Sequence, residues 1–235
     1  RRQKAVYYGV GSPHPLAPER FTRLTGMAPS YIGFTDMFSR LLATVTKIDA
    51  AWRANSEQLG VRPDPYIAVG VKHGNACGAG VSHRRRVDAI RKMIDGDRLA
   101  IHGGVVMLTF PVGKEEVEAL LTHGMPEGSR RLLDGIVAPA FKAGAVDTLK
   151  RKGDKCRLYA NPKLDNKKFV LPMDTTPVRR QVFGGGWLTQ SADTFVLTWN
   201  RKRLMVGPDL TVEQKLDLLL AWAIGSTSNS NTITI

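Results

Sequence analysis

Two groups that can exchange protons stand side by side at Lys72 and His73, inside the stretch VKHGNACGAG of residues 71–80. They follow the apolar, β-prone run YIAVGV of residues 66–71, which is typical of a strand buried in a parallel sheet. Neighbouring residues of a strand point to opposite faces, so both side chains reach one site only where the strand ends or bends. The small residues after His73 permit such a bend.

A histidine beside a lysine can support acid–base chemistry. Imidazole titrates near neutrality, and a neighbouring ammonium group favours its neutral form, which accepts a proton. The ammonium group can also stabilise a developing oxyanion. The same pair is an ordinary feature of exposed strand ends, so the residues alone define only a candidate proton-transfer site.

Several other kinds of site are excluded by motif. The sequence has no GxxxxGK[ST] phosphate loop, no GxGxxG after a strand, no GxSxG elbow and no HExxH pair. Its two cysteines, Cys77 and Cys156, lie far apart and do not form a zinc signature or a secreted disulfide framework. We therefore expect no metal and a reducing, cytoplasmic setting.

Charge and composition narrow the class of ligand. The 235 residues are 43% hydrophobic and carry a net charge of +13, a field that attracts anions such as phosphorylated metabolites, folates or nucleic acid. No apolar run approaches the roughly 18 residues of a membrane span, and we expect no membrane association. The basic residues form short scattered clusters, so nucleic acid ranks last among the partners. The chain starts without Met or a signal region, and we interpret it as trimmed or processed.

The elements that must position Lys72 and His73 alternate along the chain. A helix is expected from Thr35, its capping residue, to Gly60, with an apolar stripe of Met37, Leu41, Leu42, Val45, Ile48 and Trp52. Further helices are predicted over residues 87–94, 114–124, 144–152 and 213–224, and strands over 66–71, 104–110, 135–140, 156–160, 167–173, 195–199 and 231–235. Glycine-rich residues 183–187 predict a tight backbone passage. Alternating strands and helices indicate a layered α/β fold.

Six blocks of the sequence resemble one enzyme family in the family's own order. Residues 71–80 resemble the VKHxNPCG segment of the AICAR transformylase family, the formyltransferase part of a bifunctional enzyme of purine biosynthesis that also carries IMP cyclohydrolase. The other five blocks are VYYGVGSPHP (6–15), RLAIHGGVVML (98–108), LLDGIVAPAFKAGAVDTLKRK (132–152), RRQVFGGGWLTQSAD (179–193) and LDLLLAWAIGSTSNSNTITI (216–235). Together they cover nearly the whole chain.

The resemblance implies a fold and an activity. The family fold is a duplicated α/β unit of the cytidine-deaminase-like type without the zinc, so residues 1–193 would be a first unit and residues 194–235 the incomplete start of a second. A helix followed by a strand occurs in both, at residues 35–71 and 213–235. The family transfers a formyl group from 10-formyltetrahydrofolate to the amine of AICAR, a phosphoribosyl aminoimidazole carboxamide. Its active sites form across a dimer interface.

The resemblance also assigns roles to residues. His73 would be the general base, Lys72 its electrostatic partner, and Asn231 the group that orients the formyl oxygen or the base. Substrate-binding residues would be Tyr8, Gly9, Asn75, Gly103 and Asp134. Without the resemblance, Tyr8 and Gly9 are loop residues, Asn231 is a turn asparagine, Gly103 a packed glycine and Asp134 a strand-start cap.

The sequence departs from the family pattern at three places. Tyr7 stands where the family has arginine, Ala76 where it has proline, and the chain ends at Ile235, before the family's GxGxGQxxR segment. Three interpretations stay open. The chain is one part of a split or processed enzyme, completed in a homodimer or by a second chain. Alternatively, it is a diverged paralogue that acts on another phosphorylated amine or folate-like donor. The third interpretation is a non-catalytic module that binds phosphorylated ligands or RNA or serves assembly.

Overall fold

The computed structural model describes residues 6–199 and 207–234. The strands are β1 (Thr22–Thr25), β2 (Tyr66–Lys72), β3 (Asn75–Ser82), β4 (Val105–Leu108), β5 (Gly135–Ala138), β6 (Arg157–Ala160), β7 (Val178–Gln181) and β8 (Trp187–Gln190). The helical elements are η1 (Pro18–Arg20), α1 (Tyr31–Thr35), the π-helical η2 (Asp36–Arg40), α2 (Leu41–Leu59), α3 (Arg86–Gly96), α4 (Lys114–Thr122), α5 (Ala145–Leu149), η3 (Pro162–Leu164) and α6 (Val212–Thr227).

Six strands form one mixed sheet in the order β1-β6-β5-β4-β2-β3. Strands β4, β5 and β6 run parallel to one another, whereas β2 is antiparallel to both of its neighbours, β3 and β4. The expected α/β class is confirmed, but the expectation that residues 66–71 lie in a parallel sheet is wrong. A strand covered on both faces is apolar throughout whichever way its neighbours run, so its composition does not reveal their direction.

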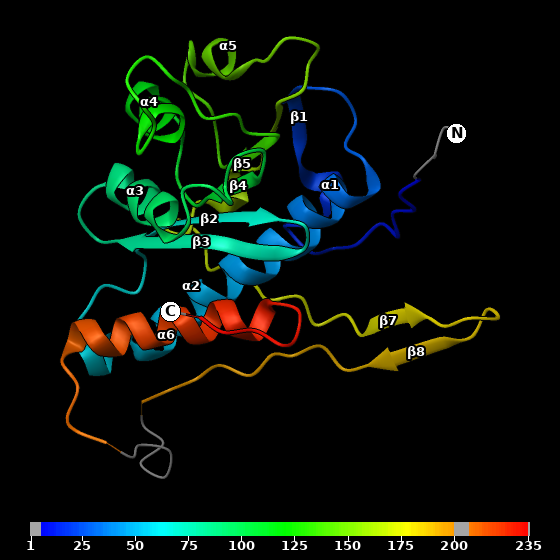
Figure 1. Cartoon of the computed structure of the whole chain (residues 1–235). Coiled ribbons are helices and arrows are strands. Elements are labelled where there is room, and N and C mark those ends of the chain that lie inside the picture. The colour runs from blue at the N-terminus through cyan, green and yellow to red at the C-terminus, as the bar shows by residue number, and fades with distance from the viewer. Residues whose placement is uncertain (1–5, 200–206, 235) are drawn as a thin grey trace.

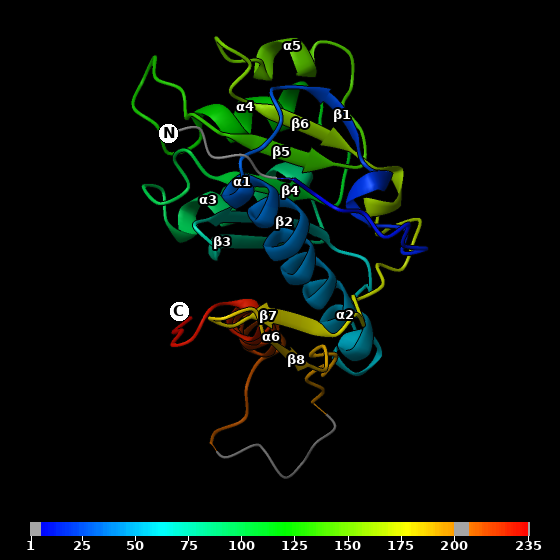
Figure 2. The ribbon, with the colours of Figure 1, turned by 90° about the vertical axis from the view of Figure 1, so that its right-hand side faces the viewer.

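Helices cover both faces of the sheet, and a further helix lies outside them. Figures 1 and 2 show α3, α4 and α5 on one side of the sheet and α2 on the other, with α6 packed on the far side of α2. Alternate residues of β2 serve the two faces: Ile67, Val69 and Val71 join the cluster around α2, and Ala68 joins the cluster around α3 and α4. The candidate pair at the end of β2 therefore follows a strand held from both sides.

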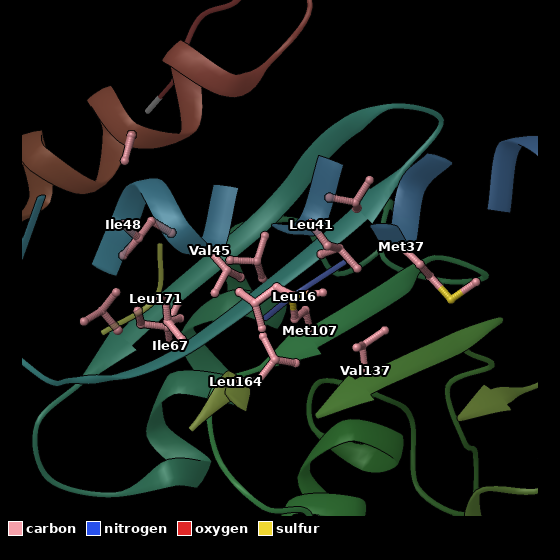
Figure 3. Packing of buried hydrophobic residues seen from close by; sticks show 14 of the residues in the cluster. Leu16, Met37, Leu41, Val45, Ile48, Ile67, Met107, Val137, Leu164 and Leu171 are labelled. Carbon is pink, nitrogen blue, oxygen red and sulfur yellow. The ribbon is translucent and has the colours of Figure 1, made fainter. Parts of the chain in front are cut away.

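The apolar stripe of the long helix packs as expected. Met37, Leu41, Val45, Ile48 and Trp52 are buried in the core cluster beneath the sheet, while Leu42 is partly buried against it. Figure 3 shows several of these side chains meeting residues of β2, β4 and β5. This helix therefore packs against the part of the sheet that leads to His73.

The helix begins earlier than expected. Ser30 is the capping residue, because its side chain accepts a hydrogen bond from the backbone N–H of Gly33, and Thr35 lies inside the helix. One π-helical turn, Asp36–Arg40, joins α1 to α2. The helix ends at Gly60, as predicted.

The prediction of strands over residues 167–173 and 195–199 is wrong: residues 166–169 form a turn, and the rest is irregular chain that pairs with no strand among the described residues. Polar side chains of α2 take their backbone hydrogen bonds instead. Asp49 accepts from the N–H of Leu171 at 3.2 Å, and the amide of Asn55 bonds both Leu197 O and Trp199 N at 2.9 Å. Asp49 and Asn55 are fully buried, so these contacts hold the segments against the helix.

Two hairpins appear where other structure was expected. The glycine-rich run after His73 is strand β3, not a bend, and residues 178–190 form the β7–β8 hairpin with the predicted tight passage at its turn. Residues 231–234 form no strand, and Ile235 lies outside the described residues. The division at residue 193 stays a prediction. In the described part of the chain, no helix is both long and apolar enough to cross a bilayer.

Candidate functional site

Strand β2 turns into β3 through only two residues, His73 and Gly74. Their φ angles are 55° and 84°, both in the left-handed region that a two-residue type I′ hairpin turn requires. Glycine adopts this region freely, and histidine is among the residues that tolerate it. Lys72 and Asn75 are cross-strand partners on either side of the turn. One hairpin end thus carries Lys72, His73 and Asn75 together.

The turn is fixed to the long helix. The backbone N–H of Gly74 donates to Asp36 Oδ1 at 2.8 Å, and Asp36 is only 6% exposed at the start of the π-helical turn. A buried carboxylate needs such donors, and the loop gains a fixed position from it. Asp36 is a site residue that the sequence pattern did not single out.

Lys72 reaches along the edge of the sheet toward the next strand. Its Nζ donates to the carbonyl oxygen of His102 at 2.7 Å, just before Gly103. Gly103 has a φ of 76° and donates its N–H to Leu132 O at 2.8 Å. The predicted residues Lys72 and Gly103 therefore lie on one edge, where β2 ends and β4 begins.

Asp134 lies on the same edge, at the start of β5. Its N–H donates to Gly104 O at 2.9 Å, which places it beside the strand that Gly103 leads into. Its Oδ1 is paired with Arg151 at 2.7 Å, and the side chain is half-exposed. Any ligand hydroxyl at Asp134 would share the carboxylate with Arg151.

The chain after α6 returns to the hairpin. The backbone N–H of Asn229 donates to Asn75 Oδ1 at 3.0 Å, and Arg40 donates to Asn229 Oδ1 at 2.6 Å. Asn231, the predicted residue, is exposed two positions further on, and its side chain forms no hydrogen bond within residues 6–199 and 207–234. Asn229 and Arg40 were missed; the repeated SNSN sequence is the signal that could have indicated Asn229.

Tyr8 and Gly9 are not brought to this edge by any hydrogen bond or ring contact in the described ranges. Both are exposed, Tyr8 to 83%. The ring of their neighbour Tyr7 packs in a tilted orientation against the ring of Phe34, with 4.8 Å between the ring centroids. The Tyr7 hydroxyl donates a hydrogen bond to Glu19 Oε2 at 2.8 Å. Partial burial, followed by the bond to Glu19, raises the pKa of Tyr7 to about 12.

A cavity of about 540 Å³ lies between the opening segment, α2, the base of β7–β8 and the end of α6. Its lining includes His14, Arg40, Lys47, Asp193 and Thr227, but neither Lys72 nor His73. We place the candidate chemistry at the hairpin, because the proton-transfer groups are there. The cavity shares Arg40 with it.

The site has the groups for proton transfer but is open to water. His73 is exposed, and its ring has no hydrogen-bond partner in the part of the chain that the structure describes. Burial raises the pKa of the Cys77 thiol on β3 to about 11, so this thiol stays protonated and is no nucleophile at neutral pH. Across residues 6–199 and 207–234, no group of three His, Cys, Asp or Glu side chains could hold a metal ion.

Comparisons with known proteins give a consistent result. The family model described as the AICARFT/IMPCHase bienzyme matches residues 1–235. The chain is 28% identical over 234 residues to the bifunctional purine biosynthesis protein PurH of Rippkaea orientalis and 28% identical over 233 residues to that of Thermosynechococcus vestitus. It is 29% identical over 236 residues to PurH of Mycobacterium leprae. These matches cover 99% of this chain but only 38–39% of each relative, so the chain spans about two fifths of their length.

Proposed function

The chain belongs to the AICARFT/IMPCHase bienzyme family, and from this premise we propose that it contributes to a formyltransferase of purine biosynthesis. The reaction would move a formyl group from 10-formyltetrahydrofolate to the amine of AICAR. The observation that supports this most is the Lys72-His73 pair on a turn held by Asp36 and by the Asn75–Asn229 contact. The finer assignment of the fold to the cytidine-deaminase-like type belongs to the same proposal.

Each group of the turn would have one task. The amine nitrogen of AICAR attacks the formyl carbon, and the imidazole of His73 takes the proton that the nitrogen loses. The ammonium group of Lys72, on the edge of the sheet, stabilises the negative oxygen of the tetrahedral intermediate. The intermediate then expels the folate nitrogen, which takes up a proton, so formyl-AICAR and tetrahydrofolate are formed. Asn75 and Asn231 would orient the reacting groups.

The exposure of the site to water suggests that another chain covers it during the reaction. The aromatic amine is a weak nucleophile, and water must be kept from the formyl donor, yet His73 is exposed on the described surface. We therefore propose that a second copy or a second chain covers the hairpin and adds ligand contacts. Asp134 and Gly103 lie on the same edge and would face the nucleotide, while Tyr8 and Gly9 would join it through the opening segment.

A second candidate is a module that binds phosphorylated ligands without catalysis. Tyr7 supports this alternative, because it replaces the arginine expected as a phosphate ligand and is itself bonded to Glu19. The net charge of +13 also fits anion binding of either kind.

The test measures formyl transfer by the protein in its native assembly, with AICAR and 10-formyltetrahydrofolate. We expect His73→Ala to lower kcat by about a hundredfold or more, the usual contribution of a general base. The matched control is His123→Ala, which removes an imidazole that is bonded to Asp95 and forms no hydrogen bond with the turn in the part of the chain that the structure describes. A wild-type rate in His73→Ala would remove His73 from the mechanism. If neither AICAR nor the folate binds, the formyltransferase proposal fails and the non-catalytic module is favoured.

A further inference from the structure

Two of the five histidines, His73 and His102, have exposed side chains whose rings form no hydrogen bond within residues 6–199 and 207–234. The other three rings are partly buried, and their nitrogens are bonded or enclosed by protein: His14, His83 and His123. Imidazole titrates near neutrality, so an exposed and unbonded ring is able to exchange a proton with a ligand. The function proposed above uses His73 alone, which leaves His102 as a second proton-transfer group.

Lys72 links the two histidines. It precedes His73 in the chain, and its Nζ donates to the carbonyl oxygen of His102 at 2.7 Å. The ammonium group is therefore in contact with the backbone of one histidine and belongs to the sequence neighbour of the other. Both histidines lie on the edge of the sheet where β2 ends and β4 begins.

The backbone around His102 is fixed by hydrogen bonds. Asp97 Oδ1 accepts from the backbone N–H of Leu99 at 3.0 Å, and the N–H of His102 donates to Leu99 O at 3.2 Å. On the other side of His102, the N–H of Gly103 donates to Leu132 O at 2.8 Å. A residue whose chain is held on both sides keeps its position while a ligand binds, as proton transfer to a reacting atom requires.

The proposed reaction has two proton transfers at one carbon. The attacking amine of AICAR loses a proton to His73, and the folate nitrogen gains a proton as it leaves. These two nitrogens occupy different bonds of the same tetrahedral carbon, whose oxygen is stabilised by Lys72. A second imidazole near Lys72 gives each nitrogen its own proton-transfer group. Among the described residues, His102 is the histidine besides His73 that Lys72 brings to this edge.

We propose that His102 is the general acid of this reaction, an assignment that rests on the function proposed above. Its imidazolium gives a proton to the folate nitrogen as the bond between that nitrogen and the formyl carbon breaks. His73 gains one proton from the amine and His102 loses one to the leaving nitrogen, so protons and charge balance. Exchange with water restores both rings after the products leave, because both are exposed.

The pH dependence of kcat in the native assembly tests the two roles. A base acts in its neutral form and an acid in its protonated form, so the wild-type profile should be bell-shaped. His102→Gln should lower kcat at the optimum by about a hundredfold and remove the fall at high pH, whereas His73→Gln should remove the fall at low pH. His123→Gln, the matched control, should keep the wild-type rate and both limbs. A purely structural defect lowers the rate at every pH and removes neither limb.

Added imidazole gives a second readout. His102→Ala leaves room at an exposed position, so free imidazole should raise its kcat by about tenfold or more and leave His123→Ala unchanged. The thermal midpoint of His102→Ala should equal that of the wild type, since the ring has no hydrogen-bond partner in the described ranges. Absence of any rescue in a variant with a wild-type midpoint contradicts proton donation by this ring.

The outcomes separate this assignment from the function on which it rests. A wild-type rate with both limbs in His102→Gln would overturn the role of His102 and leave formyl transfer intact, with His73 carrying both protons. Loss of the low-pH limb in His102→Gln would also overturn it, because His102 would then be the base. A wild-type assembly without formyl transfer would overturn the proposed function and this assignment together.

Discussion

The two hairpins of the described structure, β2–β3 and β7–β8, are both antiparallel but differ in what surrounds them. The β2–β3 hairpin, residues 66–82, is held by the sheet, by α3, by Asp36 and by Asn229. The β7–β8 hairpin, residues 178–190, which we call the arm, pairs with no other strand among residues 6–199 and 207–234 and is exposed along its whole length. The contacts around a hairpin, not the hairpin itself, decide whether its turn can hold catalytic groups in place or serves as a surface for binding.

Glycine marks both hairpins for different reasons. In β3, a methyl group added at Gly78 would collide with the carbonyl oxygen of Met93 in α3, so helix and strand approach each other backbone to backbone. In the arm, Gly184 and Gly185 have φ angles of 85° and 96° and serve the turn alone. The contact between β3 and α3 depends on close packing of their backbones, whereas the glycines of the β7–β8 turn are needed for its backbone conformation.

The largest effect is expected from Gly78→Ala in the β2–β3 hairpin, where β3 packs closely on α3. Overpacking against a helix backbone should lower the free energy of unfolding by about 3 kcal/mol, measured by urea denaturation. The matched control is Gly186→Ala in the arm, where the added carbon would lie 3.0 Å from Cγ2 of the exposed Val182. That side chain can move, and we expect a change below about 0.5 kcal/mol. Equal losses in both variants would show that the arm is packed as tightly as β3.

A smaller effect concerns thiol reactivity. Burial raises the pKa of Cys77 to about 11, so at pH 8 its thiolate is scarcer than that of an exposed cysteine with a pKa near 8.5. We expect iodoacetamide to alkylate Thr189→Cys in the arm about a hundredfold faster than Cys77. The rate at Cys77 should keep rising with pH up to about 11, whereas the rate in the arm levels off above about pH 9. Similar rates and pH profiles would mean that β3 is open to solvent.

The smallest of the three effects is expected from Asp36→Ala, which releases the β2–β3 turn. The N–H of Gly74 loses its acceptor, and unfolding free energy should fall by about 1–2 kcal/mol. Asp36→Asn keeps an acceptor oxygen and should fall less. Hydrogen exchange at Gly74 separates the two variants: it should accelerate strongly in the alanine variant alone. Unchanged exchange there would show that other contacts hold the turn.

Much of the fold could be predicted from periodicity, because the apolar stripe of α2 and the apolar run of β2 face one core. Strand β3 could not, since glycine and alanine leave no alternating pattern of side chains. The β-prone residues at 167–173 and 195–199 predict strands, but in the structure these residues form a turn and irregular chain packed on α2. Their partners, Asp49 and Asn55, are polar helix positions that would ordinarily face solvent, and only the structure reveals that they are buried.

The part of the site that could be predicted consists of residues that are adjacent in the sequence. Lys72 and His73 are adjacent in sequence, and the strand that precedes them ends as expected. Asp36, Arg40 and Asn229 reach the same turn from distant parts of the chain, and only tertiary contacts bring them there. Asn231 and Tyr8 keep their proposed roles as predictions, because no contact of the described residues ties either side chain to the turn.

The π-helical turn at Asp36–Arg40 affects how residues are placed around the long helix. A π turn holds one residue more than the α-helix would use for the same hydrogen-bonded advance. The wider winding of the π turn absorbs its extra residue, so deletion of one residue after Asp36 would regularise the helix and leave α1 and α2 in nearly the same relative rotation. Asp36 would keep its direction toward Gly74, and only the residues between Asp36 and Leu41 would change the side of the helix on which they lie. The contact of Asp36 with the hairpin 38 positions further along the sequence therefore does not require the extra residue, which instead sets the sides of the helix on which the residues of this segment lie.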